Sequence, residues 1–457
     1  MIHCHIIIHK IKIKMMSHTH RTQIRATRAA SSTKDVYMST GAKSFLARES
    51  YNVQKALGSG SYGLVMAAFD SIKSQRVAIK RVRIDGSYKE LKQVAREIRI
   101  MRFAGCHPRI MDIKDAFVDQ ERDVLYMVLP IKDSDLSKII YSNQSLSSLH
   151  VKYFMMQIFD GLCFLHKNGI IHRDLKPANI LVNKNAKIFI GDFGLARVQS
   201  GSPGEEGTSG CMSTHIVTRW YRAPELMLIP NGIYDGSVDM WSAGCILGKL
   251  LGRTPMFPGK DFIDQLSLIF DVIGAPEPSE ISHIQNGQAC AFLGEQADRK
   301  RVDFVQMYPD SDTEITDLLD NLLVFNPARR ISARVALEMP MFEPYGEILC
   351  NPPIVHNVDI DSEIQCMGKM SRQTSTSSDI TEAASDSDSE QRNPNQRNPM
   401  ATLMATMGNL FINDVSEGND ANDDTKDGRS DEEEYLMMRQ FVINEANAVR
   451  TCGGNHA

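Results

Sequence analysis

Four polar residues follow one another closely in the middle of the chain: Asp174, Lys176, Asn179 and Asp192. Asp174 can accept the proton of a substrate hydroxyl, and Lys176 can reach a negatively charged group that is being transferred. Asn179 and Asp192 offer the oxygen ligands that Mg²⁺ prefers. Any one of these residues alone is usually a polar residue of a surface turn. The ordered set favours phosphoryl transfer, in which catalysis comes from positioning and charge neutralisation.

A glycine-rich segment precedes these residues and has the spacing G-x-G-x-x-G, with glycines at positions 58, 60 and 63. This spacing alone is weak evidence, because it also opens dinucleotide-binding folds, where it joins a strand to a helix. Here the flanking segments VMAAFD and RVAIKRVRI are β-branched and apolar, which predicts a strand on each side. Glycines between two strands form a flap whose amides can lie over phosphates, so the dinucleotide alternative is disfavoured.

The second predicted strand carries Lys80, and a strand lysine is usually solvent-exposed. Glu97 follows in a stretch without proline or glycine, which predicts a helix. An ion pair from that helix to Lys80 would hold the ammonium group against the phosphates of a nucleotide.

Together with Ala223-Pro224-Glu225, these residues stand in the order found in eukaryotic protein kinases, and residues 51–347 resemble that family. The resemblance implies an α+β, bilobal fold, with a mainly β N-lobe over 51–131 and a mainly helical C-lobe over 132–348. It implies ATP and Mg²⁺ as cofactors, with Asn179 and Asp192 as metal ligands. Lys176 gives the catalytic loop its Ser/Thr-kinase form, and the resemblance assigns catalysis to Asp174, Lys176 and Thr218.

The resemblance also implies an ATP site at the glycine-rich segment and at the hinge, the segment 126–132 that links the lobes. Pro130 would offer a carbonyl to adenine, Lys132 an amide, and Asp135 a contact to ribose; an ordinary apolar strand is the alternative reading of the hinge. The expected ATP-binding residues are Leu57, Gly58, Ser59, Gly60, Ser61, Tyr62, Gly63, Leu64, Val65, Ala78, Lys80, Glu97, Leu129, Pro130, Lys132 and Asp135.

Within the family, the segment TRWYRAPELML at 218–228 is similar to the substrate-seating loop of MAP kinases. The segment at 250–260 resembles the start of an insert shared by the wider group, and FNPARRI at 325–331 resembles a C-terminal MAP kinase motif. By that resemblance Arg330 pairs with Glu225, and the target Ser or Thr is followed by Pro. Another proline-directed kinase of the same group, or a kinase-shaped scaffold with little turnover, remains an alternative.

The activation triplet departs from the family pattern, because Ser213-Thr214-His215 stands where MAP kinases carry Thr-x-Tyr. Without the tyrosine, dual phosphorylation of that kind is excluded. We expect a single phosphate on Ser213 or Thr214, ordered by charge-assisted hydrogen bonds from guanidinium groups. The alternative is a loop ordered without phosphate. The expected regulatory residues are Ser213, Thr214, Arg96, Arg173, Arg197, Arg219 and Arg222.

The net charge of −5 over 457 residues hides an uneven distribution. Residues 1–37 carry +6, residues 356–457 carry −11, and the body between them is neutral. We expect residues 1–50 to be a basic, disordered extension, with organelle targeting as the alternative. Residues 349–457 are expected to be an acidic, mostly disordered tail. Its apolar stretches 400–412 and 435–449 could form short partner-binding helices, or be residual hydrophobicity.

Nine dispersed cysteines without a C-x-x-C pair predict reduced thiols and a cytoplasmic or nuclear location. No stretch of eighteen apolar residues indicates a membrane span. The expected partners are protein substrates with Ser/Thr-Pro sites and an upstream activating kinase, unless autophosphorylation replaces the latter. We expect no binding to nucleic acid or membranes, and a monomer.

Overall fold

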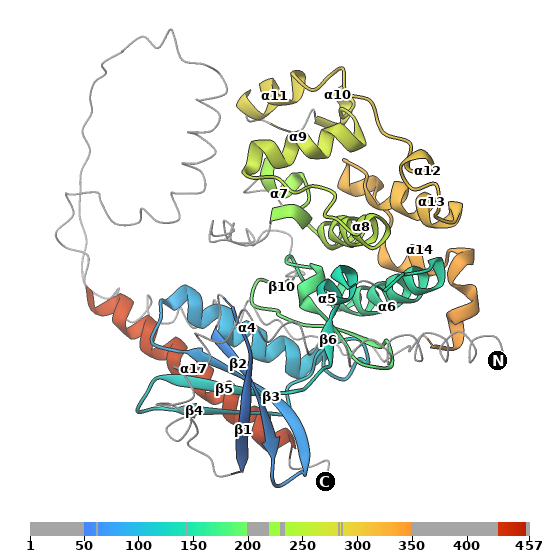
Figure 1. Cartoon of the computed structure of the whole chain (residues 1–457). Helices are drawn as coiled ribbons and strands as arrows, with labels where there is room; N and C mark the ends of the chain where they lie inside the picture. Colours follow the sequence, from blue (N-terminus) through green and yellow to red (C-terminus); the bar gives the residue numbers. More distant parts are fainter. Residues whose placement is uncertain are drawn as a thin grey trace, which may run out of the picture.

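The computed structural model describes residues 50–60, 63–142, 144–198, 219–228, 234–281, 284, 287–348 and 428–453. These residues form a smaller lobe built on a β-sheet and a larger lobe built on helices (Figure 1). The predicted α+β, bilobal fold is therefore confirmed.

The sheet of the smaller lobe has the order β1-β2-β3-β5-β4, and every neighbouring pair is antiparallel. Its strands are β1 (Tyr51–Gly60), β2 (Gly63–Asp70), β3 (Gln75–Arg83), β4 (Asp115–Asp119) and β5 (Val124–Pro130). Side chains alternate between the two faces of a strand. Val65 on β2 pairs with Lys80 on β3, so these two side chains lie on one face, whereas Leu64 and Ile79 lie on the other.

One helix of the smaller lobe, α4 (Tyr88–Ala104), crosses the sheet (Figure 1). Its start is fixed by a capping box. The backbone N–H of Glu90 donates to the hydroxyl of Ser87, and the Glu90 carboxylate accepts from the backbone N–H of Ser87. Buried residues lie on most sides of α4, including Leu91, Glu97 and Ile100. A helix buried on most sides must be covered by more than one neighbouring element.

The larger lobe is centred on two long helices, α6 (Ser148–Lys167) and α8 (Ser237–Gly252). Of these, α8 is buried on nearly every face. The α-helices are α5 (Leu136–Tyr141), α6 (Ser148–Lys167), α7 (Glu225–Leu228), α8 (Ser237–Gly252), α9 (Phe262–Ile273), α10 (Pro278–Ile281), α11 (Gly287–Gly294), α12 (Phe304–Met307), α13 (Thr313–Leu322) and α14 (Ala333–Leu337). The 3-10 helices are η2 (Pro177–Asn179), η3 (Arg219–Tyr221), η4 (Pro327–Arg329) and η5 (Pro340–Ile348).

Short strands of the larger lobe carry the segments that border the cleft between the lobes. β6 pairs with β8 and β8 with β9, while β7 pairs with β10. These strands are β6 (Ser134–Asp135), β7 (Ile170–Ile171), β8 (Ile180–Val182), β9 (Ile188–Ile190) and β10 (Arg197–Val198).

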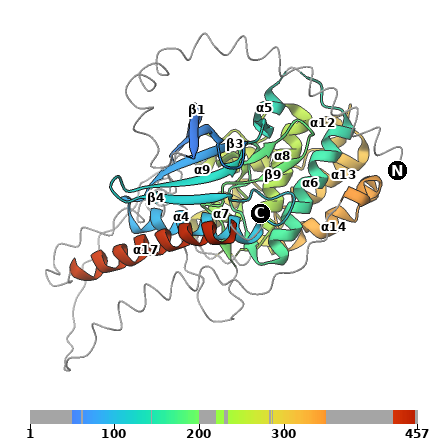
Figure 2. The same cartoon turned by 90° about the horizontal axis from the view of Figure 1, so that it is seen from below.

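A final helix, α17 (Gly428–Gly453), packs back against the smaller lobe beside α4 and β4 (Figures 1 and 2). It is longer than the apolar stretch 435–449 that the sequence indicated. Its buried face packs against this same chain, whereas Leu436 and Met437 of the stretch are exposed. The other predicted tail helix, 400–412, and the basic extension 1–49 lie outside the described residues.

Candidate active site

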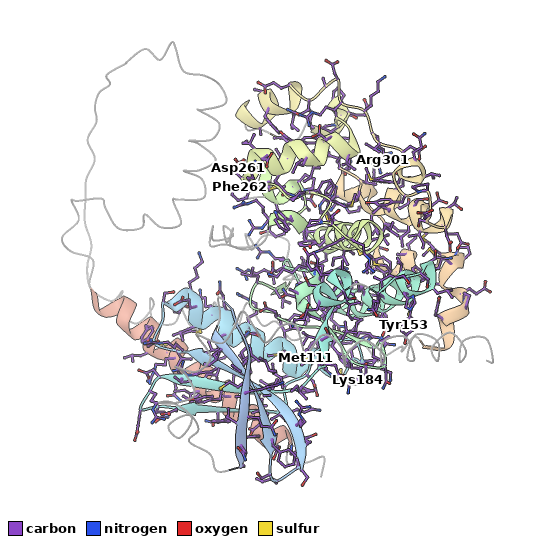
Figure 3. The ribbon with its side chains drawn as sticks, in the orientation of Figure 1. Met111, Tyr153, Lys184, Asp261, Phe262 and Arg301 are labelled. Atoms are coloured by element: carbon purple, nitrogen blue, oxygen red, sulfur yellow. The ribbon has the colours of Figure 1, made fainter. Side chains whose placement is uncertain are left out.

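A cavity of about 600 Å³ lies where the two lobes meet, and residues of both lobes line it. Met111, labelled in Figure 3, lies at this junction. Many of the expected ATP-binding residues line the cavity: Leu57, Gly58, Gly63, Val65, Ala78, Lys80, Glu97, Leu129, Pro130, Lys132 and Asp135. Lys176, Asn179 and Asp192 line it from the larger lobe.

The remaining expected ATP-binding residues are placed differently. The side chain of Leu64 packs against the cluster of Met66 and Ile79 on the opposite face of the sheet, because side chains alternate along β2. Leu64 could therefore meet a nucleotide only through its backbone. Ser59 and Gly60 belong to β1, and Ser61 and Tyr62 lie outside the described residues.

The predicted ion pair between β3 and α4 is present. Lys80 Nζ lies 2.6 Å from Glu97 Oε1 and 3.9 Å from Asp192 Oδ1. Burial alone would lower the pKa of Lys80, but the charges of Glu97 and Asp192 outweigh burial and raise this pKa. Lys80 is therefore a permanent cation at the wall of the cavity, suited to an anionic ligand.

The loop that carries Asp174 is held by a buried carboxylate that sequence reasoning missed. Asp239, near the start of α8, accepts hydrogen bonds from the backbone N–H groups of His172 and Arg173, each 2.8 Å long. His166 Nε2 lies 2.9 Å from the same carboxylate. Burial would raise the pKa of Asp239, but these hydrogen bonds and the nearby histidines lower it. The sequence indicates this role of Asp239 only by placing an acid within the largely apolar stretch SVDMWSAG.

Asp174 lies at the centre of a compact hydrogen-bonded group. Lys176 Nζ is 2.6 Å from Asp174 Oδ2, and Asn179 Nδ2 donates to the carbonyl (2.9 Å) and to Oδ2 (3.1 Å) of Asp174. Asp174 is 9% exposed, and this burial raises its pKa although Lys176 opposes the rise. A carboxylate with a raised pKa is a better proton acceptor than an ordinary aspartate, which suits a general base.

Asn179 and Asp192 border the same cavity and fit a magnesium ion held partly by phosphates. The backbone N–H of Gly191 donates to the carbonyl of Asn179 (3.0 Å), which ties the two segments together. Asp192 has a left-handed backbone conformation with φ of 66°. Among the described residues, no three His, Cys, Asp or Glu side chains are grouped to hold a metal by themselves. Mg²⁺ commonly takes one or two protein ligands together with substrate phosphates, so the pair of oxygen donors suffices.

At the hinge, β5 is buried up to Val128 and becomes half-buried at Leu129 and Pro130. Lys132 Nζ lies 3.1 Å from the centroid of the Phe189 ring. Burial lowers the pKa of Lys132 to about 8. Asp135 caps the N-terminus of α5 by accepting from the backbone N–H of Lys138 (2.9 Å).

Comparison with known proteins agrees with this geometry. The protein kinase domain model matches residues 51–342, which is more than half of the chain. The chain belongs to the protein kinase family.

Among its curated relatives are several MAP kinases. The kinase is 37% identical over 317 residues to Extracellular signal-regulated kinase 1 of Dictyostelium discoideum, a match that covers 68% of this chain and 59% of the relative. It is 40% identical over 313 residues to Mitogen-activated protein kinase 14 of Arabidopsis thaliana, covering 67% of this chain and 83% of the relative. It is 39% identical over 314 residues to Mitogen-activated protein kinase mpk-1 of Caenorhabditis elegans, covering 67% of this chain and 69% of the relative. Within its family the chain is therefore a Ser/Thr protein kinase of MAP kinase type. No helix in the described part of the kinase is long and apolar enough to cross a membrane.

The larger lobe of the kinase contains the predicted pair between Glu225 and Arg330. The guanidinium of Arg330 donates to both carboxylate oxygens of Glu225, at 2.8 and 3.1 Å. It also donates to the carbonyls of Ser237 (2.7 Å) and Val324 (3.0 Å) and lies over the ring of Trp241. This fully buried side chain links α7 to the start of α8 and to the segment before η4.

The five arginines of the predicted regulatory set occupy different surroundings. Arg219 donates to the carbonyl of Lys260, and Arg219 and Arg222 lie 5.5 and 6.0 Å from the ring of Phe262. Phe262, at the start of α9, is labelled in Figure 3. Arg173 lies 5.1 Å from the ring of Tyr234. Arg96 is buried in α4, and Arg197 donates to the carbonyl of Ala196 (3.0 Å). Their proposed common ligand would be carried by Ser213 or Thr214; these two residues and Thr218 lie outside the described residues.

Proposed function

We propose that this kinase transfers the γ-phosphoryl group of ATP, in the presence of Mg²⁺, to Ser or Thr residues followed by Pro. The observation that carries the assignment of roles is the meeting, around one cavity, of the Lys80–Glu97 pair with the oxygen donors Asn179 and Asp192. Asp174 is hydrogen-bonded to Asn179 and Lys176, which line this cavity. Lys80 binds the α- and β-phosphates, and Glu97 holds its ammonium group in place.

In the reaction, the substrate hydroxyl oxygen forms a bond to the γ-phosphorus while the bond from that phosphorus to the β–γ bridging oxygen breaks, releasing ADP. Asp174 takes the hydroxyl proton. Lys176, within 2.6 Å of Asp174, neutralises charge on the transferring group. Mg²⁺, when bound, neutralises charge on the β- and γ-phosphates. Asn179 and Asp192 would hold it, and Asn179 also fixes the Asp174 carboxylate.

The substrate preference and the partners belong to the same proposal. The names of the MAP kinase relatives support protein substrates and an upstream kinase. We propose that the substrates carry Ser/Thr-Pro sites, and that the upstream kinase, or autophosphorylation, acts on Ser213 or Thr214. We place the kinase domain at residues 51–348, with extensions at 1–50 and 349–457, and the protein in the cytoplasm or the nucleus.

A peptide assay tests the proposed reaction. The full chain is incubated with radiolabelled ATP, Mg²⁺ and matched peptides that carry Ser-Pro or Ser-Ala. We expect Ser-Pro to be phosphorylated faster, and Asp174→Asn to lower kcat by about a hundredfold to ten-thousandfold. Glu338→Gln is the matched control, because Glu338 forms an exposed pair with Arg334 and does not line the cavity.

Two outcomes would contradict the proposal. Equal rates for the two peptides would remove the proline preference. Full cellular signalling by the Asp174→Asn variant would favour the scaffold alternative over catalysis.

A further inference from the structure

The larger lobe contains a buried lysine that the proposed mechanism does not use. Lys249, in the last turn of α8, is 3% exposed. Its Nζ donates to the hydroxyl of Tyr221 (3.1 Å) and lies 4.4 Å from the centroid of the Tyr141 ring. Among the described residues, no carboxylate forms an ion pair with Lys249. A buried ammonium group is costly unless an anion compensates its charge, so this lysine indicates a site for an anionic ligand.

The two tyrosines beside Lys249 do not supply this negative charge. Burial raises the pKa of Tyr221 above its ordinary range, so its hydroxyl is neutral at physiological pH. Tyr141 interacts through the face of its ring, which attracts a cation less strongly than a carboxylate does. The C-terminal end of α8 adds about half a negative charge from the helix dipole. The positive charge of Lys249 is therefore only partly compensated.

A second cation lies at the same end of α8, and it also has no carboxylate partner in the part of the chain that the structure describes. Arg253 caps the C-terminus of α8 in a left-handed conformation with φ of 62°. Its guanidinium donates to the carbonyls of Ile140 (2.7 Å) and Gln144. These contacts hold α5 beside α8 (Figure 1). Because Lys249 lies at Tyr141 and Arg253 at Ile140, both positive charges meet at the end of α5.

This basic pair lies within reach of a peptide at the catalytic loop. Tyr221 belongs to η3, in the segment 218–228 that resembles a substrate-seating loop. Tyr141 ends α5, which begins directly after Asp135 at the wall of the nucleotide cavity and packs against η2, the helix of Asn179. An α-helix rises about 1.5 Å per residue, so Tyr141 lies about 9 Å along α5 from Asp135. Three residues of an extended peptide span about that distance.

Tyr141 is a movable cover over the ammonium group of Lys249. Tyr141 is 60% exposed, whereas Tyr221 on the other side is 6% exposed. Exposed side chains change rotamer within about a nanosecond, so the ring of Tyr141 can turn away without disturbing the core. A carboxylate that takes the place of this ring forms a charge-assisted hydrogen bond with Lys249, which is stronger than the contact to the ring.

We propose that Lys249, with Arg253 beside it, is a specificity-determining residue that binds an Asp or Glu side chain of the protein substrate, within three residues of the Ser or Thr that is phosphorylated. This inference rests on the phosphotransfer proposed above. Tyr141 shields the ammonium group when no substrate is bound, and the substrate carboxylate replaces it during binding. The kinase therefore selects Ser/Thr-Pro sites that have an acidic residue nearby.

The test measures kcat/KM of the full chain for paired peptides. Each peptide has one Ser-Pro site and either Glu or Gln at one position, from three residues before the Ser to three residues after it. We expect the Glu peptide to be preferred about fivefold or more at one of these positions. Lys249→Met should abolish this preference, while kcat/KM for the Gln peptide stays within about twofold. The control is Lys300→Met, at an exposed lysine of the larger lobe, which should keep the preference.

Charge reversal separates recognition from a merely structural role of Lys249. Lys249→Glu should prefer Arg over Gln at the same peptide position, a reversal that loss of packing would not produce. Equal kcat/KM of the wild type for Glu and Gln peptides at every position overturns the inference, and so does a preference that survives in Lys249→Met. If these variants melt below the assay temperature, Tyr141→Ala is measured instead. It removes the cover and keeps both cations, so the Glu preference should rise at least about twofold, and an unchanged preference overturns the inference.

Peptide binding, measured beside turnover, distinguishes this inference from the proposed reaction. Fluorescence anisotropy gives the affinity for Glu and Gln peptides that carry Ala in place of the Ser. A wild-type chain that binds the Glu form more tightly but phosphorylates no peptide would contradict the proposed reaction. A wild-type chain that phosphorylates Ser-Pro peptides without a Glu preference would contradict the role of Lys249 alone.

Discussion

Glu445 and Arg102 are 343 positions apart in the sequence, yet their side chains form an ion pair of 2.5 Å. The pair joins the C-terminal helix to the one helix of the catalytic cleft that carries Glu97. Since α4 is covered by the sheet on one side and by α17 on another, its position depends on both. The placement of a residue at the nucleotide site is thereby tied to a part of the chain beyond the kinase match at 51–342.

Loss of the Lys80 cation should abolish most phosphotransfer without unfolding the protein. Lys80→Met removes the charge whose pKa Glu97 and Asp192 raise. We expect kcat to fall about a hundredfold or more, as for removal of one preorganised electrostatic group. Lys89→Met, at an exposed position of α4, serves as the control, and steady-state kinetics with circular dichroism provide the measurement. A fall of less than threefold would remove Lys80 from its assigned role.

The buried Arg330–Glu225 pair should contribute more to stability than the exposed Arg334–Glu338 pair. Arg330→Met leaves the Glu225 carboxylate, which is 11% exposed, without its partner. We expect the free energy of unfolding to fall by about 3–5 kcal/mol, measured by urea denaturation. Arg334→Met breaks an exposed pair and should cost about 0.5 kcal/mol or less. Equal costs for the two variants would contradict the structural role of Arg330.

Asp239 should control the catalytic loop through the backbone. Asp239→Asn cannot accept both N–H groups of His172 and Arg173 as the carboxylate does, so at least one buried donor loses its charged acceptor. We expect a loss of about 2–5 kcal/mol in the free energy of unfolding. We also expect a lower kcat with little change in KM, because the loop carrying Asp174 is displaced. Wild-type kcat in the variant would show that Asp174 is positioned without Asp239.

Magnesium dependence should follow the two oxygen donors. A chelator should abolish turnover, and added Mg²⁺ should restore it. In Asp192→Asn, which loses the carboxylate charge, we expect half-maximal activity to require about tenfold more Mg²⁺ or higher. Asp271→Asn, an exposed acid on α9, is the control. An unchanged Mg²⁺ titration in Asp192→Asn would argue that the metal is held elsewhere.

Lys132 should make stability rise with pH in an alkaline window. Its pKa is lowered by burial from 10.5 to about 8, so between these values the unfolded chain binds more protons than the folded chain at this residue. Stability rises with pH wherever the unfolded state binds more protons. Compared with Lys132→Met, the wild type should therefore gain stability from about pH 8 to about pH 10.5. Urea denaturation of both proteins across this range checks the sign, and a parallel pH dependence would contradict it.

The sequence was sufficient where a residue belongs to an ordered set with a recognisable chemical purpose. The sequence predicts the pairs of Lys80 with Glu97 and of Arg330 with Glu225, and both pairs are present. Side chains alternate between the faces of β2, so the sequence also predicts that Leu64 faces away from the cavity if Val65 faces it.

Other contacts join residues that have no local pattern in common. Asp239 is one acid in a buried helix, and its partners are backbone N–H groups, which no sequence displays. Glu445 follows an acidic run that is typical of a solvated tail, and only the packing of α17 gives it two arginine partners. The single phosphate expected on Ser213 or Thr214 stays a prediction.

The attachment of α17 to the smaller lobe is intramolecular, because residues 349–427 connect it covalently to the larger lobe. Its occupancy is therefore independent of protein concentration as long as the chain is intact. One proteolytic cut within 349–427 would turn the same contact into a bimolecular complex, from which α17 would dissociate on dilution. A nicked sample of this kinase would thus lose α17 when diluted, although every catalytic residue remained in place.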